Sequence, residues 1–189
     1  MKKTILTAVF LLSLTVLPVQ AQKQPAGMRV EVCDAETDKG EYSIFTYKDT
    51  DEDDSFGYYL SLGRVADFLG ADEILGMEVK NIHEVTIRLG ATTDEALANI
   101  DTILDLYDKD LDTTVEFQGR AATSGFKLGE PVTTTCTVVK KALGGKRLQF
   151  LFPEGKRQAR AYLSKSTLKE LRANFKIDIK LHPKQHRKQ

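Results

Sequence analysis

The sequence predicts an α+β fold that is mainly antiparallel sheet with two or three amphipathic helices. Short segments rich in β-branched and aromatic residues alternate with turn residues along most of the chain, and neighbouring segments of this kind typically form hairpins. Two further segments place apolar residues at helical spacing, and each has a Thr-x-x-Glu capping pattern at its start. Hairpins combined with a few helices are typical of α+β domains.

The first 21 residues predict export. Lys2 and Lys3 form a positive start, residues 5–17 are almost all apolar, and residues 19–21 have the small-residue pattern of a signal-peptide cleavage site before Gln22. The apolar run is too short for a permanent anchor, and no later segment has the length of a transmembrane helix. We therefore expect a periplasmic or extracellular protein without a transmembrane anchor.

The first half of the mature chain predicts three strands. Residues 22–27 contain Pro and Gly and are expected to form a flexible leader. Residues 28–33 alternate as a strand does, and residues 41–47 and 56–60 predict a hairpin whose turn is the acidic segment 49–54.

Two helices are predicted next, separated by an extended segment at residues 77–89. Ser61 is expected to cap a short helix. Thr92 and Glu95 have capping-box spacing and begin the clearest helix of the chain, residues 93–108. The apolar face of this helix carries Leu97, Ile100, Ile103, Leu104 and Tyr107.

The second half predicts a further series of hairpins followed by a helix. Four segments have the composition and alternation of strands: residues 113–119, 132–140, 148–152 and 159–163. Thr167 and Glu170 repeat the capping-box spacing, so a helix is expected to follow, and residues 177–181 are predicted to be a last strand.

An internal duplication is also predicted. An offset of 103 residues aligns Tyr59-Leu60-Ser61 with Tyr162-Leu163-Ser164, and in both places strands precede a capped helix. The expected fold therefore has two β-β-β-α-β units, residues 28–80 and 131–182, joined by a β-α-β segment at residues 81–130. Chance recurrence of hairpin-to-helix patterning is the alternative explanation.

Charge is divided unevenly within the single predicted domain, residues 28–182, and its basic tail, residues 183–189. Residues 22–112 contain 8 basic and 22 acidic side chains, whereas residues 113–189 contain 17 basic and 5 acidic side chains. Such a division indicates either a polyanionic or membrane-surface partner, or two oppositely charged halves that pack together.

Cys33 and Cys136 are the two cysteines of the chain. An exported protein can form a disulfide, so a Cys33–Cys136 bond and a pair of free thiols are both compatible with the sequence. The alternation of residues 28–33 places Val30 and Val32 inward and Cys33 outward, while Cys136 shares a face with Val138. This difference argues against the bond.

The acidic turn offers a weak metal-binding pattern. Asp49, Asp51 and Asp53 occupy alternate positions, as in a calcium loop. However, Asp54 stands where such a loop needs Gly, and Leu60 stands where it needs Glu. A solvated hairpin tip is the favoured interpretation, and no metal or other cofactor is predicted.

Basic residues near the C-terminus form the candidate ligand-binding surface. Four of them recur on one face of the last predicted helix, and three precede it on a hairpin. The seven residues are Lys156, Arg157, Arg160, Lys165, Lys169, Arg172 and Lys176. They suit the phosphate or sulfate groups of a phospholipid or an anionic glycan. Nucleic acid is not expected as a partner of an exported chain that lacks interleaved aromatic residues.

No catalytic motif of a known enzyme class is present in the sequence. The leading hypothesis is a small exported, non-enzymatic binding or interaction module of the cell envelope or extracellular space, with another protein or a second copy as its partner. The first alternative is an anionic-ligand binder that uses the basic surface. The second alternative is a hydrolase that uses paired carboxylates such as Asp105 and Asp108.

Overall fold

The computed structural model describes residues 24–37, 40–68, 80–123, 127–154 and 157–186. The signal peptide predicted at residues 1–21 lies outside these residues. The strands of the described residues are β1 (Arg29–Thr37), β2 (Gly40–Lys48), β3 (Phe56–Phe68), β4 (Lys80–Gly90), β5 (Thr114–Thr123), β6 (Pro131–Lys140), β7 (Lys146–Glu154) and β8 (Arg157–Leu163). The helices are the short 3₁₀ turn η1 (Asp53–Ser55), α1 (Thr93–Leu106) and α2 (Lys165–Leu181).

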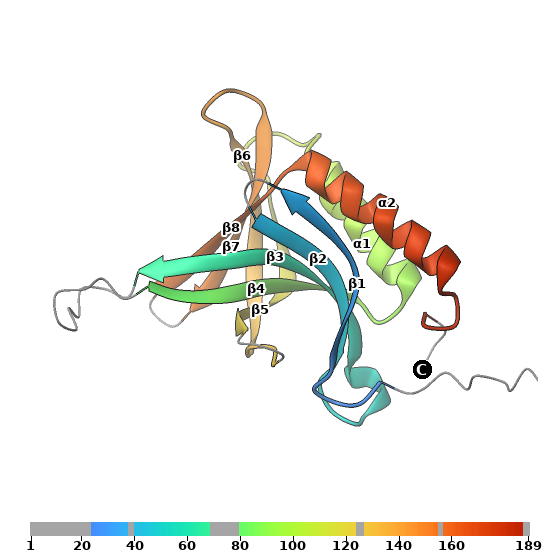
Figure 1. The fold of residues 1–189 in the computed structure, drawn as a ribbon. Helices are drawn as coiled ribbons and strands as arrows, with labels where there is room; N and C mark the ends of the chain where they lie inside the picture. Colours follow the sequence, from blue (N-terminus) through green and yellow to red (C-terminus); the bar gives the residue numbers. More distant parts are fainter. Residues whose placement is uncertain (1–23, 38–39, 69–79, 124–126, 155–156, 187–189) are drawn as a thin grey trace, which may run out of the picture.

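The eight strands form one continuous sheet in which spatial order follows chain order from β1 to β8. Every strand is antiparallel to its neighbour. The sheet curves strongly, and α1 and α2 lie next to each other across one of its faces (Figure 1). The prediction of a mixed α+β fold with several helices and repeated units was therefore wrong, because a single sheet dominates the molecule.

The short helix expected after Ser61 is instead part of β3. Tyr58, Leu60 and Leu62 alternate toward the core, as in a strand. The ladder with β4 continues beyond Ser61 and pairs Val65 with His83. Strand pairing on this long segment replaces the short helix that local patterning favoured, which illustrates how tertiary context overrides propensity.

The strand expected at residues 177–181 is instead the end of α2. Ser164 caps this helix by accepting a hydrogen bond from the Thr167 backbone N–H, so the cap lies three residues earlier than predicted. The apolar stripe of Leu168, Leu171 and Phe175 extends at helical spacing to Ile179. The stripe keeps the segment helical and attached to the core.

These two corrections also remove the predicted duplication. The second unit has three strands followed by α2, but the first has a continuing strand where its helix was expected. Tyr59 is buried in a cluster with Phe45, whereas Tyr162 is half-buried beneath the guanidinium of Arg147, 3.9 Å from its ring centroid. The aligned tyrosines therefore occupy different environments.

The prediction of α1 is confirmed. The Thr92 hydroxyl accepts a hydrogen bond from the Glu95 backbone N–H at 3.2 Å, and the Glu95 carboxylate accepts one from the Ala91 N–H at 2.7 Å. Ile100 and Ile103 are fully buried against the sheet. The helix thus covers β4 with a well-defined apolar face.

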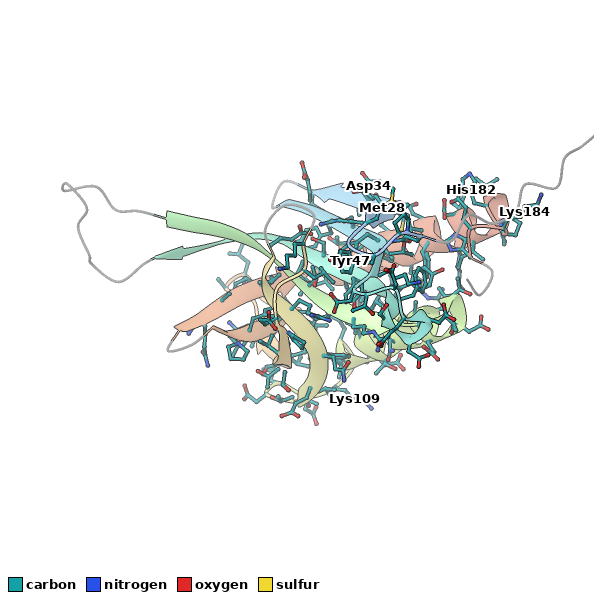
Figure 2. The ribbon with its side chains drawn as sticks, turned by 90° about the horizontal axis from the view of Figure 1, so that it is seen from below. Met28, Asp34, Tyr47, Lys109, His182 and Lys184 are labelled. Atoms are coloured by element: carbon teal, nitrogen blue, oxygen red, sulfur yellow. The ribbon has the colours of Figure 1, made fainter. Side chains whose placement is uncertain are left out.

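The main core lies between the two helices and the sheet, and a smaller cluster lies on the opposite face of the sheet. Tyr58 of β3 contacts Phe175 of α2 in the main core, while its neighbour Tyr59 points the other way and stacks on Phe45. Tyr47, which is labelled in Figure 2, and Leu128 complete this smaller cluster. We call this side of the sheet, which α1 and α2 do not cover, the helix-free face.

Cys33 and Cys136 are free cysteines in the structure. A register shift between Glu31 and Cys33 marks a β-bulge in β1, which turns Cys33 toward the core and leaves Val30 38% exposed. The assignment was therefore wrong for Val30 and Cys33, whereas Val32 packs against the core as predicted. Burial raises the pKa of both thiols to about 12, and Asp178 adds to the shift at Cys33.

Candidate functional site

A row of side chains crosses the helix-free face from strand to strand. The strand registers place Phe45 of β2 beside Tyr59 of β3, Tyr59 beside Arg88 of β4, and Gln118 of β5 beside Thr133 of β6. Arg88 and Gln118 lie on the adjacent strands β4 and β5 and both line one cavity, together with Tyr59 and Thr133. The row passes from buried aromatic rings to a guanidinium, an amide and a hydroxyl.

Arg88 is the central cation of this row. Its Nη2 donates a hydrogen bond of 3.3 Å to the Phe56 carbonyl oxygen. A guanidinium carries five N–H donors, and Arg88 forms no ion pair with any residue that the structure describes. Gly57 leaves room for this side chain, since a Cβ atom there would lie 3.1 Å from Arg88 Nε. The guanidinium is thus held in place with most of its donors uncommitted.

Arg120 of β5 is a second guanidinium at the cavity, and its position is fixed by two partners. Its Nη2 donates to Asp49 Oδ2 at 3.0 Å, and its Nη1 donates to the Gly129 carbonyl oxygen at 3.1 Å. This ion pair joins the β2–β3 turn to β5. Arg120 therefore acts mainly as a clamp at one side of the cavity.

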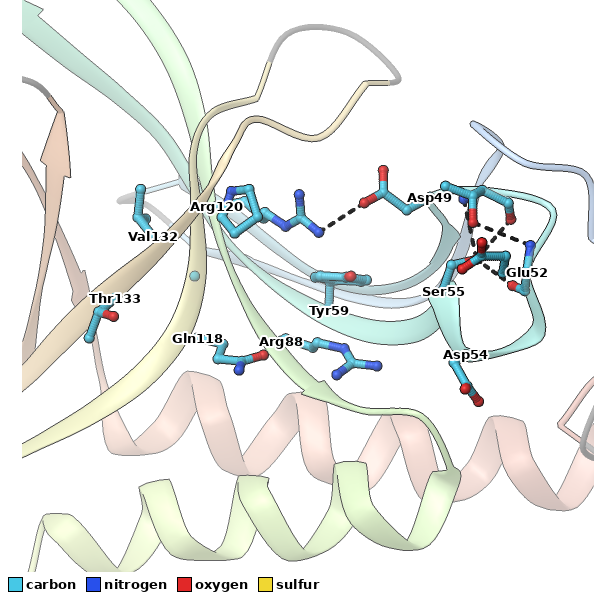
Figure 3. A pocket seen from close by; sticks show the side chains of 13 residues that line it. Asp49, Glu52, Asp54, Ser55, Tyr59, Arg88, Gln118, Arg120, Val132 and Thr133 are labelled. Carbon is cyan, nitrogen blue, oxygen red and sulfur yellow. Dashed lines mark hydrogen bonds and ion pairs between the residues drawn. The ribbon is translucent and has the colours of Figure 1, made fainter.

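The cavity lies between this row and the acidic β2–β3 turn and has a volume of about 500 Å³. Figure 3 shows Tyr59 between the two arginines, with Glu52 and Asp54 on the turn across from the strands. Ser55 braces the turn: its Oγ lies 2.7 Å from the Thr50 carbonyl oxygen and 2.6 Å from that of Glu52, which share its single O–H donor, and it accepts a hydrogen bond from the Thr50 N–H at 3.2 Å. The cavity consequently has a cationic wall and an anionic wall.

The cavity walls suit reversible polar binding. A guanidinium donates paired hydrogen bonds to a carboxylate, and such charge-assisted bonds are stronger than those between neutral groups. Gln118 offers both a donor and an acceptor, and Thr133 offers a hydroxyl beside it. Groups of these kinds are able to hold and orient a small polar molecule.

The predicted metal candidates belong to the acidic turn but have other partners. Asp49 pairs with Arg120, and Asp53 lies 4.0 Å from Lys48 Nζ. Asp51 is exposed. No group of three or more His, Cys, Asp or Glu side chains in the described part of the chain is arranged to hold a metal ion.

The predicted basic surface faces α1 at two of its positions. Lys165 Nζ donates to Asp108 Oδ1 at 2.8 Å, and Arg172 forms a two-point contact with Asp101 at 2.5 and 2.8 Å. The hydrogen bond and the positive charge of Arg172 hold the pKa of Asp101 below its usual range, and Lys165 lowers the pKa of Asp108 in the same way. These two basic residues join α2 to α1.

The other members of that surface are only partly characterised. Lys169 and Arg160 are exposed, and Lys176 is half-buried. Lys156 lies outside the described residues, and for Arg157 only the backbone is described. Asp105, one of the two carboxylates considered for a hydrolase, is exposed, while the other, Asp108, pairs with Lys165.

Sequence reasoning did not find the row across the helix-free face. Tyr59, Arg88, Gln118 and Thr133 come from four strands, and nothing local in the sequence joins them. One indication was available: Arg88 stands between the buried apolar residues Ile87 and Leu89, which places its charged side chain on the face of the strand opposite to theirs. The partners of Arg88 depend on the strand order, which the predicted repeat misassigned.

Neither helix within the described residues is long and apolar enough to cross a membrane. No protein-family model matches the chain, and comparisons with curated proteins and with solved structures give no significant match.

Proposed function

We propose that this protein is a small exported, non-enzymatic binding module whose ligand site is the cavity on the helix-free face. The observation that carries the proposal is the uncommitted guanidinium of Arg88, set in a row with Gln118 and Thr133. Pockets of 300 to 1,000 Å³ with a few convergent polar groups are typical sites for small ligands, and this cavity falls within that range.

The ion pairs of Lys165 and Arg172 support a structural role for much of the basic surface. An anionic glycan or phospholipid bound at α2 would have to compete with Asp108 and Asp101 for these two side chains. We therefore favour the cavity over the basic surface as the ligand site.

A protein partner is the second candidate, at the outer strands of the sheet. Among the strands that the structure describes, β1 pairs with β2 alone. Met28, just before β1, is 48% exposed, and Val30, within it, is 38% exposed. Strand edges and exposed apolar residues recruit other chains by β-strand addition. Light scattering of the mature chain and of Val30→Lys tests this candidate, which predicts self-association that the substitution abolishes.

The test of the cavity is ligand-dependent stabilisation of the mature chain. Thermal unfolding is measured with amino acids, dipeptides, dicarboxylates, neutral sugars and inorganic phosphate. A compound at 100 times its Kd stabilises the folded state by about 2.7 kcal/mol, which is readily seen as a rise in Tm. We expect at least one class to raise Tm in the wild type, to leave Tm unchanged in Arg88→Ala/Gln118→Ala, and to be recovered chemically unaltered.

The matched control is Arg147→Ala, which removes an arginine that lies over Tyr162 and does not line the cavity. This variant should keep the ligand-induced rise in Tm. A rise that persists in Arg88→Ala/Gln118→Ala, or the absence of any rise in the wild type, contradicts the cavity as a ligand site. Conversion of the compound during incubation contradicts the non-enzymatic part of the proposal.

A further inference from the structure

The two walls of the cavity carry opposite charge, and this arrangement specifies a ligand class. Arg88 and Gln118 come from β4 and β5, while Glu52 and Asp54 come from the turn that precedes β3. Arg120 and Asp49 satisfy each other at the rim. The charged wall groups that remain for a ligand are thus one guanidinium and two carboxylates.

Arg88 favours a ligand that carries a carboxylate. The side chain is half-buried and passes over Gly57, so its guanidinium is already positioned before a ligand arrives. An anionic group that accepts its free N–H donors gains charge-assisted hydrogen bonds, and little side-chain entropy is lost because the arginine is held.

The acidic turn limits how much negative charge the ligand can bring. No ion pair with a described residue is formed by Glu52 or Asp54, and both are exposed at the cavity. A polyanion entering the cavity would meet these carboxylates at short range and be repelled. A protonated amine on the ligand would instead be attracted to them.

Resting on the proposed binding function, we infer that the cavity binds a small zwitterion, with its carboxylate on Arg88 and its protonated amine toward Glu52 and Asp54. A free amino acid and a dipeptide share this chemistry, and a volume of about 500 Å³ accommodates either. Arg88 is the residue that selects the carboxylate, and the acidic turn is the element that selects the amine.

The experiment compares four probes by isothermal titration of the mature chain: L-alanine, L-alanyl-L-alanine, its C-terminal amide and its N-acetyl derivative. We expect the dipeptide or the amino acid to bind, and the comparison of the two identifies the source. Each blocked derivative should bind at least ten-fold more weakly than the unblocked dipeptide, because each lacks one of the two charges. Equal binding of either blocked form overturns the inference.

Variants assign each charge to its wall. Glu52→Gln/Asp54→Asn should weaken binding of the dipeptide at least five-fold. It should not weaken binding of the N-acetyl derivative, whose only charge is one that these carboxylates repel, whereas Arg88→Ala should weaken binding of both compounds. Gln118→Ala lies at an exposed position, so it carries little risk to folding. Like Arg88→Ala, it should weaken binding of both the dipeptide and its N-acetyl derivative. If Glu52→Gln/Asp54→Asn does not change the affinity for the dipeptide, the inference is overturned.

The same data separate failure of this inference from failure of the binding function. If phosphate or a neutral sugar binds in an Arg88-dependent way and no zwitterion does, the cavity is a ligand site and the zwitterion assignment is overturned. If neither phosphate, nor a neutral sugar, nor a zwitterion binds, or if all binding is independent of Arg88, then the cavity is not a ligand site and the zwitterion assignment fails with it.

Discussion

His186 attaches the end of the chain to the core through two hydrogen bonds. Its Nε2 lies 2.7 Å from Asp178 Oδ2, and its Nδ1 lies 2.9 Å from the hydroxyl of Tyr58. Because a carboxylate only accepts, the proton is placed on Nε2, and in the neutral ring Nδ1 accepts from the Tyr58 hydroxyl. The ring also stacks on Tyr58 with centroids 6.0 Å apart. A residue in the segment expected to be a basic tail thus completes a buried network.

His186→Ala should lower the free energy of unfolding by about 1 to 3 kcal/mol, because it leaves the buried Tyr58 hydroxyl without its partner. Urea unfolding measures this change. In a Tyr58→Phe background no hydroxyl is left unpaired, so the same substitution should cost less. An equal loss in both backgrounds would show that the hydrogen bond contributes nothing and that only ring packing matters.

Asp101 gives the contact between the helices a pH dependence. Arg172 lowers the pKa of this carboxyl in the folded state, so its contribution to stability is present above its ordinary pKa of 3.8 and is lost as the pH falls through the lowered value. The wild type and Asp101→Asn should therefore differ in stability at neutral pH and converge at low pH. Urea unfolding between pH 7 and pH 2 measures this, and a constant difference over that range would contradict it.

At the scale of single elements, α1 covers the sheet through a face centred on Ile100 and Ile103. Both are fully buried, while Leu104, which the sequence also assigned to the apolar face, is half-buried at the edge of the core. Tyr107 ends the helix, and its buried hydroxyl donates to the Leu163 carbonyl at 2.7 Å. The helix is therefore attached both to β4 and to the end of β8.

Ile103→Ala should lower the free energy of unfolding by about 2 to 5 kcal/mol, as expected for a fully buried aliphatic side chain. Leu104→Ala is the matched control on the same helix and should cost less, since its side chain keeps solvent contact. Chemical unfolding of both variants checks the order. A larger loss for Leu104→Ala would mean that the helix presents a different face to the sheet.

Local patterns predicted the elements that local interactions determine. The cap at Thr92, the helix that follows it and the hairpin around the acidic turn depend on residues close in sequence, and all three are present. Ser61 and Ile177 were misassigned because their conformation depends on distant partners: strand β4 in one case, and the packing of α2 on the core in the other. The β-bulge after Glu31, which turns Cys33 inward, is likewise not determined by alternation alone.

At the scale of the whole molecule, the two oppositely charged halves are joined by ion pairs. Arg120 pairs with Asp49, Lys165 with Asp108, and Arg172 with Asp101, each time a basic residue of the second half with an acidic residue of the first. This supports the interpretation that the uneven charge serves assembly of the fold. It also leaves Arg88, a basic residue of the acidic half, as the cation with uncommitted donors at the cavity.

The prediction of export can be tested at the signal-peptide cleavage site. Because Ala21 completes the small-residue cleavage pattern, exported material should begin at Gln22. Mass spectrometry of the intact exported protein, with N-terminal sequencing, checks the cleavage position. Retention of Met1 would remove the basis for a periplasmic or extracellular location.

The most direct test of the account is to locate the ligand site by nuclear magnetic resonance. Residues 22–189, labelled with ¹⁵N, are titrated with L-alanyl-L-alanine and, separately, with inorganic phosphate. If the cavity is the ligand site, the dipeptide shifts the backbone amide signals of Tyr59, Arg88, Gln118 and Thr133 and leaves those of α2 in place. The largest shifts at Lys165, Lys169 and Arg172 with either compound, or no shifts on the helix-free face, would contradict it.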